Sequence, residues 1–145
     1  MLKRLLIIVG LLLVGAVVVL QLIPFGRNHT NPPVISEPAW DSPETRALAV
    51  RACFDCHSNE TVWPWYSNIA PFSWLMQQDV DEGRRSLNFS EWGSGRIREL
   101  NEIGEVIQEG GMPPAQFLIT HPNARLSAAE KEKLIQGLMA TFQGR

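Results

Sequence analysis

Two cysteines and a histidine stand close together at Cys53, Cys56 and His57, in the pattern C-x-x-C-H. This pattern is typical of the covalent attachment of a c-type haem. On a helical turn, residues three apart lie on one face, so both sulfurs can reach the two vinyl groups along one haem edge. The histidine that follows can supply a neutral imidazole nitrogen to the iron. The motif therefore predicts one covalently attached haem c, with Cys53 and Cys56 as thioether donors and His57 as the proximal iron ligand.

Other uses of a cysteine pair fit this sequence less well. A thioredoxin-like C-x-x-C opens a helix after a strand, and no strand pattern precedes Cys53. A structural zinc site needs four ligands, typically two separated pairs, and only His29 and His121 remain to complete such a set. A plain disulfide would explain neither the adjacent His57 nor the long loops of the chain. We therefore favour haem attachment.

The second axial ligand is expected from a loop that follows a helix stop. Gly110-Gly111 ends a helical stretch, and the two prolines after Met112 stiffen a loop that can direct its thioether inward. We expect Met112 as the distal iron ligand. His121 is the alternative ligand, and an open or water-bound position is the third possibility. Methionine also fills irregular core space, which is the ordinary role that Met112 could have instead.

Four further side chains have either a haem role or an ordinary one. Trp63 and Trp65 follow the motif closely, and large aromatic rings pack well against a porphyrin or in any core. Arg84 and Arg85 could pair with a haem propionate through their N–H donors. Solvation is the preferred expectation for both arginines, because acidic side chains lie close to them in sequence at Asp79, Asp81 and Glu82.

The amino terminus predicts a membrane anchor. Nineteen residues from Leu5 to Ile23 carry no charge and follow Lys3 and Arg4. As a helix rising about 1.5 Å per residue, they span about 30 Å of hydrocarbon. The run is longer than the apolar part of a cleaved signal and lacks a small-residue cleavage pair, so we expect residues 5–23 to remain as a signal anchor. Lys3 and Arg4 place residues 1–4 in the cytoplasm and the rest in the periplasm or at the cell exterior.

Residues 24–41 contain four of the ten prolines and predict an extended spacer before a haem-binding domain at 42–145. Residues 24–145 carry 11 basic and 15 acidic side chains, a net charge of −4 (11 − 15). Nucleic-acid binding domains carry a basic stripe, so this balance argues against a nucleic-acid partner.

The domain shows four helical stretches and no convincing strand. They begin at Ser42, after Pro71, near Ile97 and at Ser127. The first has a capping serine followed by proline, the third stops at Gly110-Gly111, and the fourth opens with a capping box. Long irregular connections remain at 57–70 and 111–126, which is uncommon in a small domain unless something is held between them. The pattern predicts an all-α domain of about four helices with long loops, preceded by one transmembrane helix.

Residues beyond the motif resemble the bacterial haem-binding domain family. The matching blocks are Cys53–Thr61, Trp63–Ser67 with Ala70-Pro71, Asn88–Trp92, Met112–Pro114 and Leu126–Glu130. The resemblance covers roughly residues 40–142. A haem-bearing first helix, an M-P-P loop and a capped last helix are, more distantly, similar to class I cytochrome c. By analogy with the loop of those cytochromes, the carbonyl of Ala70 or a nearby residue is expected to accept a hydrogen bond from His57.

This resemblance implies a membrane-anchored protein with a single haem c. Histidine and methionine ligands favour one-electron transfer with transient redox partner proteins at the membrane surface, rather than catalysis. A haem-based ligand sensor or binding module with a displaceable or open sixth position is the alternative. An enzyme is the third hypothesis, and it would need a distal acid–base group for which the domain offers only His121.

Overall fold

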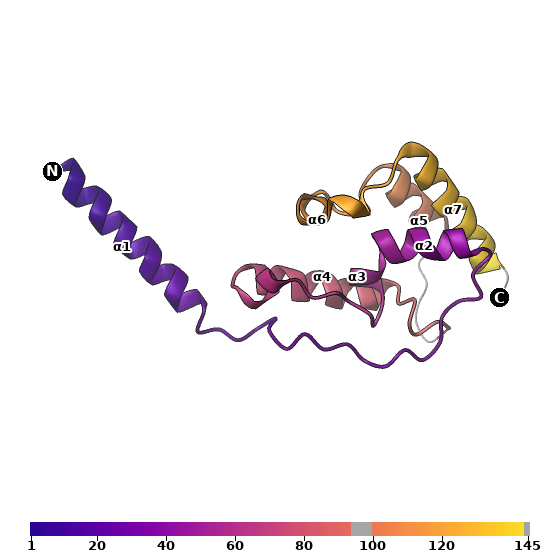
Figure 1. Cartoon of the computed structure of the whole chain (residues 1–145), viewed down its shortest axis with the longest axis horizontal. Helices are drawn as coiled ribbons and strands as arrows, with labels where there is room; N and C mark the ends of the chain where they lie inside the picture. The colour runs from indigo at the N-terminus through magenta and orange to yellow at the C-terminus, as the bar shows by residue number, and fades with distance from the viewer. Residues whose placement is uncertain (94–99, 144–145) are drawn as a thin grey trace. The chain divides into compact units, whose positions relative to one another are not determined.

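A computed structural model describes residues 1–93 and 100–143 of the chain (Figure 1). Its regular elements are all helical in these residues, and the β-pairing they contain is an isolated parallel bridge between Ser36 and Glu91. The α-helices are α1 (Leu2–Leu20), α2 (Pro43–Ala52), α3 (Phe54–His57), α4 (Phe72–Ser86), α5 (Leu100–Gln108), α6 (Ala115–Thr120) and α7 (Ala128–Gln143). Two 3-10 helices, η1 (Trp65–Asn68) and η2 (Pro122–Ala124), lie in the long connections. The predicted all-α class is confirmed.

The chain divides into two compact units. Unit 1 consists of Met1–Thr30 and Trp63–Asp79, and unit 2 consists of Asn31–Val62 and Val80–Arg145. Helix α4 therefore begins in unit 1 and ends in unit 2. In unit 1, α1 is apolar and long enough to cross a membrane, as expected for a membrane anchor or a signal sequence.

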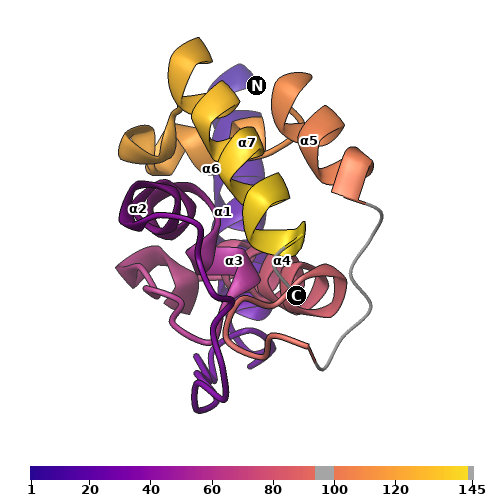
Figure 2. The ribbon, with the colours of Figure 1, turned by 90° about the vertical axis from the view of Figure 1, so that its right-hand side faces the viewer.

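The core of unit 2 forms where α7 packs against both α2 and α5 (Figure 2). Its buried side chains are Leu48, Ala49, Ala52, Phe54, Phe89, Ile107, Leu126, Leu134, Leu138 and Phe142. The crossing of α2 and α7 is close because α7 carries Gly137 there, and a Cβ at this position would collide with the side chain of Thr45. The absence of a side chain at Gly137 therefore sets the distance between the two helices.

The predicted helix starts at Ser42 and Ser127 are confirmed. The Ser42 hydroxyl accepts a hydrogen bond from the Thr45 backbone N–H at 3.2 Å, and Pro43 occupies the first turn of α2. In the capping box of α7, the Ser127 N–H donates to the Glu130 carboxylate at 2.8 Å. That bond, the Arg51 guanidinium and the Ser127 hydroxyl lower the pKa of Glu130 to about 2.

The second and third predicted helices also form, as α4 and α5. One further helix, α6, lies in the connection 111–126, which was expected to be irregular. Helix α5 ends before Gly110, whose φ of 80° lies in the left-handed region that glycine adopts readily. Ile97, the first apolar residue assigned to this stretch, lies outside the described residues. Helix α6 was not predicted, because its six residues are too few for a helical period to show in the sequence.

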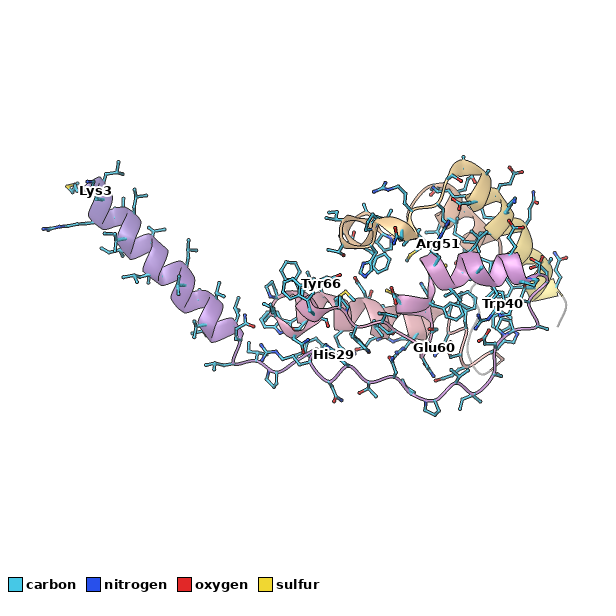
Figure 3. The ribbon with its side chains drawn as sticks, in the orientation of Figure 1. Lys3, His29, Trp40, Arg51, Glu60 and Tyr66 are labelled. Atoms are coloured by element: carbon cyan, nitrogen blue, oxygen red, sulfur yellow. The ribbon has the colours of Figure 1, made fainter. Side chains whose placement is uncertain are left out.

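The segment 24–41 contains no helix. Its second half belongs to unit 2, where the Ser36 carbonyl accepts a hydrogen bond from the Trp92 N–H at 3.0 Å. The Ser90 carbonyl accepts a bond from the Ser36 N–H at 3.1 Å. Trp40, labelled in Figure 3, follows these residues, and its ring centroid lies 5.2 Å from that of Phe89. These residues of the expected spacer thus contribute contacts to the folded unit.

Replacing Gly137 with alanine should destabilise the protein by about 1–3 kcal/mol, because the added methyl group overpacks the contact with Thr45. Chemical denaturation followed by circular dichroism measures the change. Gly104→Ala is the matched control, since a Cβ in that helix meets only the end of the Ile135 side chain, at 3.3 Å. Equal stability of the two variants would contradict the close crossing.

Candidate functional site

The C-x-x-C-H motif forms one tight turn that consists of Cys53, which joins α2 to α3, and the four residues of α3. Cys53 follows the last residue of α2, and its N–H donates to the Ala49 carbonyl at 2.8 Å. The Cys53 carbonyl accepts hydrogen bonds from the N–H groups of Cys56, at 3.1 Å, and of His57, at 2.8 Å. Both cysteines are half-buried free thiols. Both cysteines thus lie on one short helical turn, as attachment to one haem edge requires.

Helix α4 passes directly over this turn at Gly83. A Cβ at Gly83 would collide with the backbone carbonyl and the Cβ of Cys56. Only a glycine lets the backbone of the helix approach the motif this closely. Gly83 therefore positions the motif. The sequence alone does not indicate this role, because Gly83 and Cys56 are adjacent only in the fold.

The ring of His57 is held by the end of α4. Its Nδ1 lies 3.1 Å from the Leu87 carbonyl oxygen, and the Gly83 carbonyl also lies in hydrogen-bonding reach. A carbonyl can only accept, so Nδ1 carries the proton and Nε2 keeps the lone pair that an iron needs. Burial lowers the pKa of His57, so its ring is neutral.

The prediction that the Ala70 carbonyl accepts a hydrogen bond from His57 is wrong. Both backbone groups of Ala70 pair with the side chain of Gln21 in unit 1, at 3.0 Å each. The true acceptor, Leu87, immediately follows α4, where the last carbonyl groups of a helix lack partners within it. A helix end thus takes the role assigned to a proline-containing loop.

An apolar pocket opens beside the motif, entirely within unit 2. Cys53, His57 and Met112 line it together with Ser86 and Glu102, and the remaining lining is apolar: Ala52, Leu87, Phe89, Ile103, Val106, Ile107 and Leu138. Its empty volume is about 750 Å³, which includes the space at its open mouth. An apolar lining with a few polar groups is typical of sites for small molecules and cofactors.

The thiol of Cys53 is not arranged for thiolate chemistry. Burial, followed by the neighbouring Cys56, raises the pKa of Cys53 to about 12. A thiol with a raised pKa offers little thiolate for disulfide exchange. In the described parts of the chain, no group of three or more histidine, cysteine or acidic side chains could hold a metal ion. The donors instead fit a haem, which brings its own four nitrogens and needs only axial ligands from the protein.

Met112 reaches the pocket from the loop after α5. The Val106 carbonyl accepts hydrogen bonds from the N–H groups of Gly111, at 2.8 Å, and Met112, at 3.1 Å, which fold this loop back against the helix. The Met112 side chain lines the same pocket as His57 and is 37% exposed. The structure thereby brings the two expected axial ligands to one pocket.

Residues 15–140 match the family model described as a haem-binding domain. The chain belongs to the haem-binding domain family. No curated protein and no solved structure matches it. The family match begins within α1 and includes the proline-rich segment, so it extends further toward the amino terminus than the resemblance over 40–142 indicated. Family membership supports haem as the ligand of this protein.

His121, the alternative ligand, does not line the pocket of this haem-binding domain. It follows α6, and its ring stacks on Phe117 with the ring centroids 4.0 Å apart. Its Nδ1 lies 3.0 Å from the Thr120 hydroxyl and 3.2 Å from the Phe117 carbonyl oxygen. These local contacts explain the position of the His121 ring outside the pocket.

Trp63 and Trp65 belong to unit 1, whereas the pocket is formed by unit 2. Trp63 stacks on His29, with the ring centroids 4.7 Å apart and an angle of 15° between the rings. The aromatic ring at the pocket is Phe89, which is 1% exposed and stacks on Phe54 at 5.5 Å. Its place in the Asn88–Trp92 block of the family resemblance was the signal that could have indicated it.

Arg84 is half-buried, and the Asp81 carboxylate acts on it electrostatically, so the expected solvation is only partial. Its Nε donates to the Ser58 carbonyl at 2.8 Å. Its Nη2 donates to the Thr61 hydroxyl and to the Asn31 side-chain oxygen, at 3.0 Å each. Arg84 therefore braces the residues that follow the motif. Arg85 is exposed.

Gly83→Ala should lower the amount of haem that the haem-binding domain retains. The added methyl group must push α4 away from Cys56, which separates His57 from the Leu87 carbonyl and costs about 1–3 kcal/mol of stability. Haem per protein, measured from the absorbance of the pyridine complex, checks this. Glu82→Ala, an exposed neighbour on the same helix, is the control. Wild-type haem content in Gly83→Ala would contradict the positioning role.

Proposed function

We propose that the protein is a membrane-anchored carrier of single electrons, with one haem c held outside the cytoplasmic membrane. One observation carries the proposal: His57 and Met112 line a single apolar pocket beside the C-x-x-C turn, in a chain of the haem-binding domain family. A histidine with a methionine is the ligand pair typical of electron-transfer haems.

Each residue of the site has a defined task in this proposal. Cys53 and Cys56 hold the haem through thioether bonds, and His57 Nε2 and the Met112 sulfur are its axial ligands. Bound there, the haem supplies an iron that gains or loses one electron. The Leu87 carbonyl keeps the His57 ring in one orientation, because turning the ring would break its hydrogen bond. The apolar side chains around the pocket exclude water, which favours the reduced state and raises the reduction potential.

Helix α1, as a membrane anchor, holds the carrier at the membrane surface. Helix α1 has no charged residue after Arg4, and none of its side chains is buried. Lys3 and Arg4 before the apolar run favour a cytoplasmic amino terminus and a haem domain on the periplasmic or outer face. Held at the membrane surface, the domain exchanges electrons with proteins of the same membrane through small, transient contacts.

A second candidate function rests on the exposure of Met112. A ligand that is 37% exposed on a loop can leave the iron more easily than a buried one. The sixth position would then accept a diatomic gas, and the protein would be a haem-based sensor. Binding of carbon monoxide to the reduced wild-type protein favours the sensor, and the absence of binding favours the carrier.

Met112→Leu should abolish the weak far-red absorption of the ferric protein that marks a methionine–iron bond, and it should lower the reduction potential. Leucine keeps the volume of the side chain but offers no sulfur. Optical spectra and a redox titration measure both effects. Met139→Leu, on α7, is the matched control and should leave spectrum and potential unchanged. An unchanged spectrum in Met112→Leu would exclude this ligand.

The double variant Cys53→Ser with Cys56→Ser should lose all haem that migrates with the chain on a denaturing gel. Each single variant keeps one thioether, so it should retain part of this haem signal. The proteins are produced in a host that matures c-type cytochromes, and the gel is stained for haem. If the wild type binds haem in its native state but shows none on the gel, binding is not covalent and the c-type assignment fails, while haem binding stands.

A further inference from the structure

We propose that unit 1 carries a lipid-contact patch, in which Trp65, Ile69, Phe72 and Leu75 enter the boundary between headgroups and acyl chains beside the end of α1. The occupant of this patch is the lipid of the leaflet into which α1 emerges. The inference rests on α1 being a membrane anchor, which is part of the proposed function. It adds a second, peripheral contact with the bilayer that the anchor alone does not provide.

The end of α1 is bound to the segment that carries the patch. Gln21 caps α1, and its side chain pairs with both backbone groups of Ala70: its Nε2 donates to the carbonyl and its Oε1 accepts from the N–H, at 3.0 Å each. Arg27 donates a further bond to Gln21 Oε1 at 2.9 Å. Ala70 therefore lies at the level where the apolar helix ends.

Two more contacts hold the next residues of the chain to the same segment. Gly26 has a φ of 76° and lies so close to α4 that a Cβ would collide with the Ser73 carbonyl. The Nε2 of His29 lies 2.9 Å from the Ser67 hydroxyl, and its ring stacks on Trp63. Figure 3 shows His29 and Tyr66 on these two adjoining stretches of unit 1. The patch is thus fixed at the membrane end of the chain by contacts on both sides of Ala70.

The patch is apolar and exposed. Trp65 is 76%, Ile69 40%, Phe72 53% and Leu75 56% exposed. Phe72 and Leu75 are three residues apart in the first turn of α4, so they share one face of the helix. Tyr66 joins the rings into a group, with its ring centroid 5.9 Å from Trp65 and 6.1 Å from Phe72. Soluble surfaces rarely gather so many large apolar side chains.

The patch fits a lipid environment because its segment is uncharged and because it lies close to the end of α1. Between Glu60 and Asp79 the chain carries no charged side chain, so the patch segment brings no charge of its own into the bilayer. Arg27 is the charged residue beside it, and its long side chain can extend toward the headgroups. Ile69 and Phe72 lie within two residues of Ala70, and a residue advances the chain by at most about 3.8 Å. They therefore fall within the interfacial layer, which extends roughly 5–8 Å beyond the hydrocarbon on each side. Tryptophan and other aromatic side chains are enriched in this layer.

The full-length haem-loaded protein, reconstituted into phosphatidylcholine vesicles that contain a phospholipid with a photoreactive group on its acyl chain, tests the inference. After irradiation, the labelled residues are mapped by mass spectrometry. We expect label on α1 and also on residues 65–75. A variant with Trp65→Ser and Phe72→Ser should lose the label on residues 65–75 and keep it on α1. Ile119→Ser, which replaces another exposed apolar side chain in unit 2, is the control and should leave both labels unchanged.

Two results would overturn the inference in different ways. Label on α1 with none on residues 65–75 shows an anchored protein whose patch does not touch lipid, so this inference fails and the anchor stands. No label on α1 shows that the helix does not span the bilayer, so the anchor of the proposed function fails and this inference fails with it. Crosslinking of residues 65–75 to a second protein instead of lipid also counts against the patch as a lipid contact.

Discussion

The contact between the end of α4 and the C-x-x-C-H turn is the constraint on which the site depends. At Gly83 the helix backbone touches Cys56, and one turn further its end offers the Leu87 carbonyl to His57. One helix therefore sets both the position of the motif and the tautomer of its histidine. The pocket walls from α5 and α7 then face a ring that is already oriented. A helix that passed a few ångströms further away would leave His57 free to turn.

Much of the fold followed from local signals in the sequence. Capping residues such as Ser42 and Ser127 act within one turn, and the predicted helices begin where these residues stand. Helix α6 and the role of Gly83 did not follow. A six-residue helix carries too few apolar positions for a period, and the value of a glycine at 83 depends on Cys56 lying beside it in space.

The candidate site was predictable to a similar degree and for the same reason. The spacing of Cys53, Cys56 and His57 is itself a chemical pattern, whereas the partner of His57 is thirty residues away in sequence. Arg84 shows the same limit. Its sequence neighbours predict contact with acidic side chains, but not the hydrogen bonds to Ser58, Thr61 and Asn31, which the folded chain brings to it.

The burial of Cys53 has a consequence for how the protein is made. The thiol lies against walls supplied by α5 and α7, which are synthesised after the motif. In the folded unit, burial raises the pKa of Cys53 to about 12, so the thiol is protonated. Before the chain has folded, the same cysteine lies in water, because those walls do not yet exist. If the haem is attached through this thiol, as proposed, attachment is easier before α5 and α7 have packed beside the motif.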